Sequence, residues 1–539
     1  MAPMTQTNSP PPSSTLPPFQ SITDLIAQNG AGRCMQTALV QGQRSVTWGQ
    51  LDAMVDRIAA TLQRDGVKPG ESIAICAANS LEYVAVFLGG LRAGAAVAPL
   101  STHSLAQQLA TMVADCGARH FFADRDVPLF ETPGARRIFM DGIAAPAWKD
   151  WLLPEGSRPR RVDVDPASPF NIIYSSGTTG TPKGIVQPHG MRWAHVARAE
   201  SYGYRPGSVT LIATSLCSNT TLVCFFPTLA KGGMVVLAPP KFDPRAWLAL
   251  AEKHRVTHTM LVPVQYQRIM AVEEFDDYNL SSFEMKFCTS APFLAGLKAD
   301  VLARWPGGLV EFYGMTEGGG TCILEAHNFP DKLHTVGKPA EGHDMRVLDE
   351  EGIELPRGSV GEVVGRSVAM MTGYHRQPAK TREAEWLDAG GQRYIRTGDV
   401  GRFDEEGFLT LMDRRKDMVI SGGFNIYPSD LEAVLRQHPA VADAAVIGIP
   451  SAEWGETPVA YVVPGTDAKE SADDLRAWLN QQVGKTQRLS ALRFTDELPR
   501  SEIGKVLKRE LRRAWAAADP AASHESSSPQ LSAASVSSD

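Results

Sequence analysis

Apolar and polar positions follow two recurring patterns along most of the chain. Short, nearly continuous apolar runs predict buried strands at residues 72–78, 94–100, 171–176, 208–215, 233–238 and 258–264. Residues 80–94 and 244–256 instead carry apolar side chains at helical spacing, with polar positions between them. Strands that alternate with helices in this way predict parallel sheets covered by helices.

The pattern changes from about Val347 onward. Shorter β segments, separated by glycine and acidic turns, lie at residues 346–352, 360–367 and 408–415. They predict a smaller, β-rich unit that follows the alternating region.

A third region begins after Arg414. Its helical patterns cover residues 428–438 and 472–483, and its strand patterns cover residues 440–450 and 458–464. This region of about 100 residues is large enough to hold a core of its own, so we expect a compact α/β unit.

Both ends of the chain lack such patterns. Residues 1–18 are rich in proline, serine and threonine, and residues 516–539 are rich in alanine and serine. Segments with so few large apolar residues cannot bury enough surface to offset the entropy of folding. We therefore expect both ends to be disordered.

Composition excludes several classes of protein. The chain has 53 Lys and Arg against 60 Asp and Glu, a net charge of −7, which argues against a nucleic-acid-binding protein. Its seven cysteines include no C-x-x-C pair, so a disulfide framework or zinc ribbon is not expected, and a reducing, cytoplasmic setting fits best. The N-terminal segment has neither the basic nor the apolar part of a secretory signal. The uncharged stretch 206–230 is interrupted by polar residues and proline, so no transmembrane segment is expected.

The sharpest motif is the Gly-, Ser- and Thr-rich string 174–184, which directly follows a predicted strand. Backbone N–H groups, hydroxyls and the Lys183 ammonium can together surround a polyphosphate. The residues expected to do so are Ser175, Ser176, Gly177, Thr178, Thr179, Gly180 and Lys183. A P-loop NTPase is rejected because Pro182 precedes Lys183 and Gly184 follows it. The remaining alternative is a flexible surface loop.

This string resembles the nucleotide loop of the adenylate-forming enzymes, which include acyl-CoA synthetases, 4-coumarate–CoA ligases, luciferases and peptide-synthetase adenylation domains. Further motifs of that family recur in order: YGMTE at 313–317, YIRTGD at 394–399, DRRKD at 413–417, GGFNIYP at 422–428 and PRSEIGK at 499–505. Several matches in a fixed order are much stronger than any one alone.

The resemblance implies an α/β fold. It would comprise a large N-terminal domain of helix-covered mixed sheets with a β-barrel-like subdomain, and a small, mobile C-terminal α/β domain. The expected bounds are 19–413 for the large domain, 414–416 for a hinge that includes Lys416, and 417–515 for the small domain.

The resemblance also implies the reaction. A carboxylate would attack the α-phosphorus of ATP to give an acyl-adenylate and pyrophosphate, and the thiol of coenzyme A would then displace AMP. The small domain would rotate between the two steps. The implied cofactors are ATP, Mg²⁺ and coenzyme A, and we expect a monomer or a homodimer.

Residue roles follow by the same resemblance. Lys505 would draw the two reacting anions together, Thr316 would donate to the α-phosphate, and Glu317 would bind Mg²⁺. The other expected nucleotide and coenzyme A contacts are Ala291, Pro292 and Tyr313 at adenine, Gly314 beside them, Asp399 and Arg414 at ribose, and Gly422 and Gly423 along the path of the thiol. By themselves, these residues also fit plainer roles: Glu317 as a solvated carboxylate, Tyr313 as a core aromatic, Asp399 in a turn, and Lys505 in a basic tail.

The acyl group is implied to contact segments 217–222, 287–292 and 314–321. The candidate residues are Ser218, Asn219, Phe287, Cys288, Gly314, Gly318 and Gly319, and the run 318–320 suggests a roomy or adaptable pocket edge. No aspartate lies in 211–223 to pair with an α-ammonium group, so a plain aryl or medium-chain acid is favoured over an amino acid.

Two alternatives stay open. The acceptor could be a carrier protein that acts in trans, or the chain could be a non-catalytic nucleotide-binding relative. The twelve histidines show no metal-binding spacing, and His189 and His195 are expected to pack or form hydrogen bonds.

Overall fold

The computed structural model describes residues 16–132, 134–141, 148–175, 182–414, 417–421, 424–451, 454–465, 468–501 and 504–518. The chain divides after Leu411 into a large unit and a small unit. The expectation of a mixed α/β fold, with a large N-terminal part and a smaller C-terminal part, is confirmed.

The large unit contains a nine-stranded first sheet. Its five inner pairings, from β13 to β1, are parallel, and its outer pairings are antiparallel. In spatial order the strands are β15 (Lys338–Pro339), β14 (Cys322–Glu325), β13 (Gly308–Tyr313), β12 (Met285–Cys288), β11 (His258–Leu261), β9 (Val209–Ile212), β10 (Met234–Leu237), β1 (Thr37–Gln41) and β2 (Arg44–Thr47).

A second sheet has seven strands. In spatial order they are β18 (Gly373–Tyr374), β8 (Lys183–Pro188), β7 (Pro169–Ser175), β4 (Ala96–Leu100), β3 (Ser72–Cys76), β5 (His120–Ala123) and β6 (Arg136–Phe139). The pairings of β7, β4, β3, β5 and β6 are parallel, whereas β8 is antiparallel to both of its neighbours. The strands predicted in the alternating region are confirmed in both sheets.

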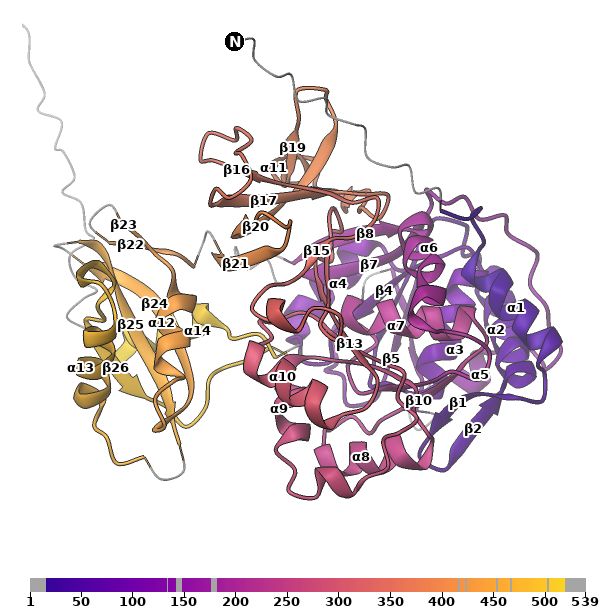
Figure 1. Ribbon diagram of the computed structural model, residues 1–539. Coiled ribbons are helices and arrows are strands. Elements are labelled where there is room, and N and C mark those ends of the chain that lie inside the picture. Colours follow the sequence, from indigo (N-terminus) through magenta and orange to yellow (C-terminus); the bar gives the residue numbers. More distant parts are fainter. Residues whose placement is uncertain are drawn as a thin grey trace, which may run out of the picture. The chain divides into compact units, whose positions relative to one another are not determined.

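Helices cover the two sheets on both faces (Figure 1). They are α1 (Ile22–Gly32), α2 (Trp48–Arg64), α3 (Leu81–Arg92), α4 (Ala106–Cys116), α5 (Trp148–Trp151), α6 (His189–Ala197), α7 (Asn219–Ala230), α8 (Pro244–Lys253), α9 (Pro263–Met270) and α10 (Ala295–Arg304). Polar N-cap residues mark the beginning of two of these helices. Ser80 caps α3 by accepting a hydrogen bond from the N–H of Tyr83 at 3.0 Å. Asp243 caps α8, whose first residue is Pro244.

Alternating side chains of β3 show why its apolar run is continuous. Ile73 and Ile75 join the largest core cluster, which also includes residues of α2, α3 and α7 and of the first sheet. Ala74 and Cys76 face the opposite way and pack with residues of α4. Because both faces of β3 are buried, its residues 73–76 are all apolar.

A third, antiparallel sheet follows, and it contains the TGD motif. Its strands are β16 (Asp344–Leu348), β17 (Gly361–Arg366), β20 (Arg393–Phe403), β19 (Glu385–Leu387) and β21 (Leu409–Arg414), and a short helix α11 (Pro378–Glu383) precedes β19. This sheet corresponds to the predicted β-rich unit.

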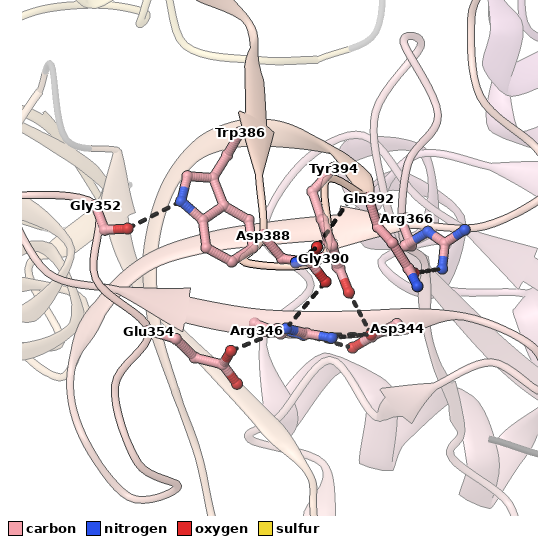
Figure 2. A network of polar contacts seen from close by, with 10 residues as sticks. All are labelled: Asp344, Arg346, Gly352, Glu354, Arg366, Trp386, Asp388, Gly390, Gln392 and Tyr394. Atoms are coloured by element: carbon pink, nitrogen blue, oxygen red, sulfur yellow. Dashed lines mark hydrogen bonds and ion pairs between the residues drawn. The ribbon is translucent and has the colours of Figure 1, made fainter. Parts of the chain in front are cut away.

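Polar contacts join β16 and β20 of the third sheet (Figure 2). The Arg346 guanidinium bonds Asp344 Oδ2 at 2.8 Å and Glu354 Oε2 at 2.9 Å, and it lies 4.8 Å from the ring centroid of Tyr394. The Tyr394 hydroxyl also donates to Asp344. Tyr394 is the first residue of the YIRTGD motif, so this network holds the beginning of β20 in place.

The described residues of the small unit form one mixed sheet and three α-helices. Its strands, in spatial order, are β23 (Phe424–Ile426), β22 (Val419–Ser421), β25 (Gly455–Pro464) and β24 (Val441–Ser451), with β26 (Ala491–Phe494) paired in parallel to β25. Its helices are α12 (Pro428–Leu435), α13 (Ala472–Gln482) and α14 (Lys508–Ala518). The two predicted helices and two predicted strands of this region are confirmed.

Helix α14 corrects one reading of the sequence. The basic residues after Lys505 suggested a solvated tail, but Leu511 and Trp515 lie one helical turn apart and are both buried. The helix continues through Ala518, three residues into the segment expected to be disordered. The rest of that segment, and residues 1–15, lie outside the described residues.

Candidate active site

The Gly-rich string connects two adjacent strands. Strand β7 ends at Ser175 and β8 begins at Lys183, and these two residues face each other in the antiparallel register. The hydroxyl of Tyr174 anchors this end of β7 by donating to Asp115 Oδ2 at 2.5 Å. The prediction that the string follows a strand is therefore confirmed. Ser176, Gly177, Thr178, Thr179 and Gly180 lie outside the described residues.

Lys183 is linked to Glu317 through a tyrosine that sequence reasoning missed. The Lys183 Nζ lies 5.1 Å from the ring centroid of Tyr374, and the Tyr374 hydroxyl donates to Glu317 Oε1 at 2.9 Å. Burial and the adjacent carboxylate of Glu317 raise the pKa of Tyr374, so it stays a hydrogen-bond donor at neutral pH. No motif signals Tyr374, because it reaches the site only through the pairing of β18 with β8.

Tyr313 and Asp399 come together from two sheets. The Tyr313 hydroxyl, at the end of β13, donates to Asp399 Oδ2 of β20 at 2.8 Å. Asp399 is 9% exposed, and its N–H donates to Thr397 Oγ1 at 3.0 Å. Burial and Asp399 hold the pKa of Tyr313 well above its usual range. Two motifs expected to meet the same nucleoside thus lie in direct contact.

The loop after Tyr313 is held by a residue of the second sheet. Gln187, fully buried on β8, donates from Nε2 to the carbonyl oxygen of Thr316 at 2.6 Å. The backbone N–H of Met371 donates to the carbonyl of Glu317 at 2.8 Å. These contacts fix the main chain at Thr316 and Glu317, the two residues expected to act on the phosphates and the metal ion.

The segment that contains Ala291 and Pro292 has an unusual backbone. Ser290 has a φ of +84°, a conformation that side chains with a Cβ rarely adopt. Its hydroxyl lies 2.6 Å from Thr220 Oγ1, and Thr289 Oγ1 donates to the carbonyl of Phe312 at 2.8 Å. The neighbouring segments therefore hold the backbone in a strained form just before the two expected adenine contacts.

Among the candidate acyl contacts, several side chains also have structural roles. Ser218 caps α7 by accepting from the N–H of Thr220 at 3.2 Å. Phe287 and Cys288, on β12, are both buried, and the Phe287 ring stacks on Phe312 with centroids 5.6 Å apart. Asn219 accepts a hydrogen bond from Arg192, which sequence reasoning did not single out.

The glycines after Glu317 lie very close to neighbouring segments, where a side chain would not fit. A Cβ on Gly318 would lie 2.1 Å from the carbonyl oxygen of Ala369, and one on Gly320 would lie 2.0 Å from Met345 Sδ. Gly319 has a φ of +87° and approaches the carbonyl of Gly365. These glycines let the loop approach its neighbours closely, and a roomy or adaptable pocket edge at 318–320 stays a prediction. Gly314 packs less tightly, with Thr321 Oγ1 at 3.3 Å from its added Cβ.

The remaining predicted residues belong to the small unit. The motif that ends in Lys505 folds back on itself: the Ser501 N–H donates to the Lys505 carbonyl at 2.8 Å, and the Lys505 N–H donates to Ser501 Oγ at 3.2 Å. Lys505 is partly buried. The Arg414 side chain, Lys416, Gly422 and Gly423 lie outside what the structure describes.

Within the described ranges, no group of three or more His, Cys, Asp or Glu side chains could hold a metal ion. One carboxylate, such as Glu317, fits Mg²⁺, which is normally held by one or two carboxylates together with substrate phosphates. The same part of the chain contains no helix that is both long and apolar enough to span a bilayer.

Comparisons with known proteins agree with this arrangement. The family model of AMP-binding enzymes matches residues 26–375, and that of the AMP-binding enzyme C-terminal domain matches residues 430–505. A feruloyl-CoA synthase of Amycolatopsis sp. is 35% identical over 88% of this chain and 95% of its own length. The fatty acid–[acyl-carrier-protein] ligase ScoC of Streptomyces coeruleorubidus is 31% identical over 93% and 97% of the two chains.

A solved structure extends the comparison to the fold. The o-succinylbenzoate CoA synthetase of Bacillus subtilis, determined with its acyl-adenylate intermediate, has a TM-score of 0.79 and 26% identity. The match covers 92% of this chain and 98% of that protein.

Proposed function

The chain belongs to the AMP-binding enzyme family, and from this premise we propose that it joins a carboxylic acid to coenzyme A through an acyl-adenylate, with release of pyrophosphate and then AMP. It is an AMP-forming acyl-CoA synthetase. The observation that carries the proposal is the meeting of three sheets at one place, with Lys183 and Tyr374 from the second, Tyr313 and Glu317 from the first and its loop, and Asp399 from the third.

In the first half-reaction, the acid carboxylate attacks the α-phosphorus of ATP. Negative charge grows on the phosphoryl oxygens, so catalysis requires positioned donors and cations rather than covalent chemistry. The hydroxyl of Thr316 and the ammonium groups of Lys183 and Lys505 supply these. Asp399 accepts from the ribose and Tyr313 stacks on adenine, which together orient the nucleotide.

Glu317 would hold Mg²⁺ together with the phosphates. The hydrogen bond from Tyr374 to Oε1 orients this carboxylate, so Tyr374 would support Glu317 as a ligand of the ion. When bound, Mg²⁺ would neutralise charge on the phosphates.

In the second half-reaction, a thiol attacks the acyl-adenylate. We propose that the small unit changes position between the two steps by rotation near Lys416. The division of the chain after Leu411, a few residues away, supports this. Gly422 and Gly423 would then line the path of the pantetheine arm, where absent side chains leave width.

The favoured acids are aryl or medium-chain acids. Support comes from the similar feruloyl-CoA synthase and from the rings of Tyr202, Phe287 and Phe312, which form edge and stacked contacts beside the expected acyl segments. Incubation of the full chain with ATP, Mg²⁺, coenzyme A and a panel of benzoates, cinnamates and fatty acids should release AMP and pyrophosphate. Release of ADP and phosphate would overturn the proposal.

A carrier protein is the second candidate acceptor, and the similarity to ScoC favours it. One assay distinguishes the two acceptors. If coenzyme A is the acceptor, it should release AMP from the preformed acyl-adenylate at a rate that saturates with the coenzyme A concentration. Adenylate that persists with coenzyme A and is discharged by a phosphopantetheinylated carrier protein would favour the carrier. A chain that binds ATP without forming adenylate from any acid would be a non-catalytic relative.

A further inference from the structure

Two arginines and two histidines meet behind the segments expected to bind the acyl group. We name Arg192, His195, Arg198 and His343 the α6 cationic cluster, because the first three lie on α6 or at its end. Arg192 Nη1 lies 3.5 Å from His195 Nδ1, and Arg198 Nη2 lies 2.6 Å from His343 Nε2. Burial, together with the nearby charges of Arg192 and Arg198, holds the pKa of His195 well below its usual range.

The positive charge of this cluster is uncompensated. In the part of the chain that the structure describes, no carboxylate forms an ion pair or hydrogen bond with any of the four residues. Arg192, fully buried, donates from Nη2 to the amide oxygens of Gln187 and Asn219 at 2.5 Å and 3.0 Å, and its buried Nε–H has no acceptor among the described residues. Buried guanidinium groups normally have an anionic partner, because taking an unpaired charge out of water is costly.

Arg198 and His343 present donors to each other. The N–H of Thr321 donates to His343 Nδ1 at 2.9 Å, so the neutral imidazole carries its hydrogen on Nε2. Nε2 therefore faces the Arg198 guanidinium, which can only donate. Two facing donors are satisfied when an acceptor binds to both, and an oxyanion would do so while neutralising the arginine.

The cluster contacts two of the three segments expected to bind the acyl group. Arg192 contacts Asn219 of the first segment, and His343 contacts Thr321 of the third. Tyr202, four positions after Arg198 in the chain, packs edge-on against Phe287 of the second segment, with ring centroids 5.4 Å apart. An anion on this cluster would therefore belong to the acyl substrate rather than to the nucleotide.

We propose that Arg198 and His343, supported by Arg192, bind a second carboxylate of the acid substrate, so that the preferred substrates are dicarboxylic acids. This inference rests on the proposed acid-activating function. The carboxylate that is not activated accepts from the Arg198 guanidinium and from His343 Nε2–H, and the rest of the acid packs against the rings near Phe287.

Matched acids test the proposal. The measurement is kcat/KM for pyrophosphate release with three pairs: benzoate and terephthalate, cinnamate and 4-carboxycinnamate, and octanoate and octanedioate. We expect a preference of about tenfold or more for the diacid of the pair whose length fits, the scale of one hydrogen-bonded charge pair. A preference for the monoacid in every pair would overturn the proposal, and so would a preference for 4-hydroxycinnamate over 4-carboxycinnamate.

Variants show whether Arg198 carries the preference. Arg198→Met should reduce the diacid-to-monoacid ratio about tenfold or more while leaving the KM for ATP unchanged, and Arg198→Lys should restore part of the ratio. The matched control is Arg205→Met, because Arg205 is exposed and paired with Glu284. An unchanged ratio in Arg198→Met would overturn the proposal.

Binding without turnover gives a second measurement. The diacid should raise the Tm of the parent more than the monoacid does, and this difference should vanish in Arg198→Met. If no acid releases pyrophosphate, the acid-activating function itself fails. If acids are activated without any preference that depends on Arg198, only the dicarboxylate inference fails.

Discussion

The phenolic hydroxyl of Tyr313 donates a 2.8 Å hydrogen bond to Asp399 Oδ2, although the two residues lie 86 positions apart in the chain. One residue ends a strand of the first sheet, and the other lies in the third sheet. The bond joins the group expected to stack on adenine to the group expected to accept from ribose. The orientation of the nucleoside therefore depends on how two separate sheets pack.

Removal of that bond should weaken nucleotide binding. In Tyr313→Phe the aromatic face remains, but Asp399 loses a donor that orients it. We expect the KM for ATP to rise about 2- to 10-fold, the scale of one net hydrogen bond, with little change in kcat. Steady-state kinetics at saturating acid and coenzyme A measure this. A normal KM for ATP would show that the bond has no role in orienting Asp399.

Loss of the Tyr374 hydroxyl should act on the metal ion. Tyr374→Phe keeps a ring beside Lys183 but removes the donor to Glu317 Oε1. We expect the Mg²⁺ concentration for half-maximal rate to rise about tenfold, because groups that orient a metal ligand typically contribute 10- to 100-fold to affinity. The control is Tyr278→Phe, remote from these residues. Equal Mg²⁺ dependence of both variants would contradict the role of Tyr374.

Loss of the Lys505 ammonium should separate the two half-reactions. Lys505→Ala should slow adenylate formation by about 10³- to 10⁵-fold, the range for a cation that stabilises phosphoryl transfer. Transfer from supplied acyl-adenylate to coenzyme A should stay within a few-fold of the parent rate. Arg509→Ala, an exposed neighbour, serves as the control. Equal slowing of both half-reactions would indicate a structural role instead.

Ser290 allows a test of backbone strain. Ser290→Ala and Ser290→Gly both lose the contact with Thr220, but only the alanine variant keeps a Cβ at a φ of +84°. We expect the glycine variant to be more stable than the alanine variant by about 1 kcal/mol in the free energy of unfolding. Denaturant unfolding of the pair measures the difference. Greater stability of the alanine variant would show that the surroundings relieve the strain.

Because His189 is buried, we expect the free energy of unfolding to decrease in acid. Its ring packs on Phe170 with centroids 5.0 Å apart, and burial lowers the pKa of His189 to about 4. Because the unfolded state takes up this proton near pH 6.5, the contribution to stability is present above that pH and is lost as the pH falls toward 4. The loss should be on the order of 3 kcal/mol in the parent and absent in His189→Phe. Unfolding free energies at pH 7.5, 5.5 and 4.5 compare them, and parallel losses in both proteins would contradict the assignment.

Sequence reasoning located residues whose motifs have a local signature. The apolar run of β7 marked where the Gly-rich string begins, and the YGMTE and TGD strings marked Tyr313, Glu317 and Asp399. It missed Tyr374, Gln187 and Arg192, because their neighbours in the sequence carry no chemical pattern. The contact from Tyr374 to Glu317 spans 57 positions, and that from Gln187 to Thr316 spans 129. It interpreted the three glycines at 318–320 as a roomy or adaptable pocket edge. It did not show that Gly319 and Gly320 closely approach residues of the third sheet.

The linear chain by itself indicated many of the strands and helices and, through short motifs in a fixed order, the family, because periodicity and motifs depend on residues close together in the sequence. Only the tertiary structure decided which side chains meet: a strand of two residues brings Tyr374 to Glu317, and the end of α6 brings Arg198 to His343. Hydrogen bonds act over about 3 Å, and that proximity arises from sheet pairing and helix packing between residues far apart in the chain.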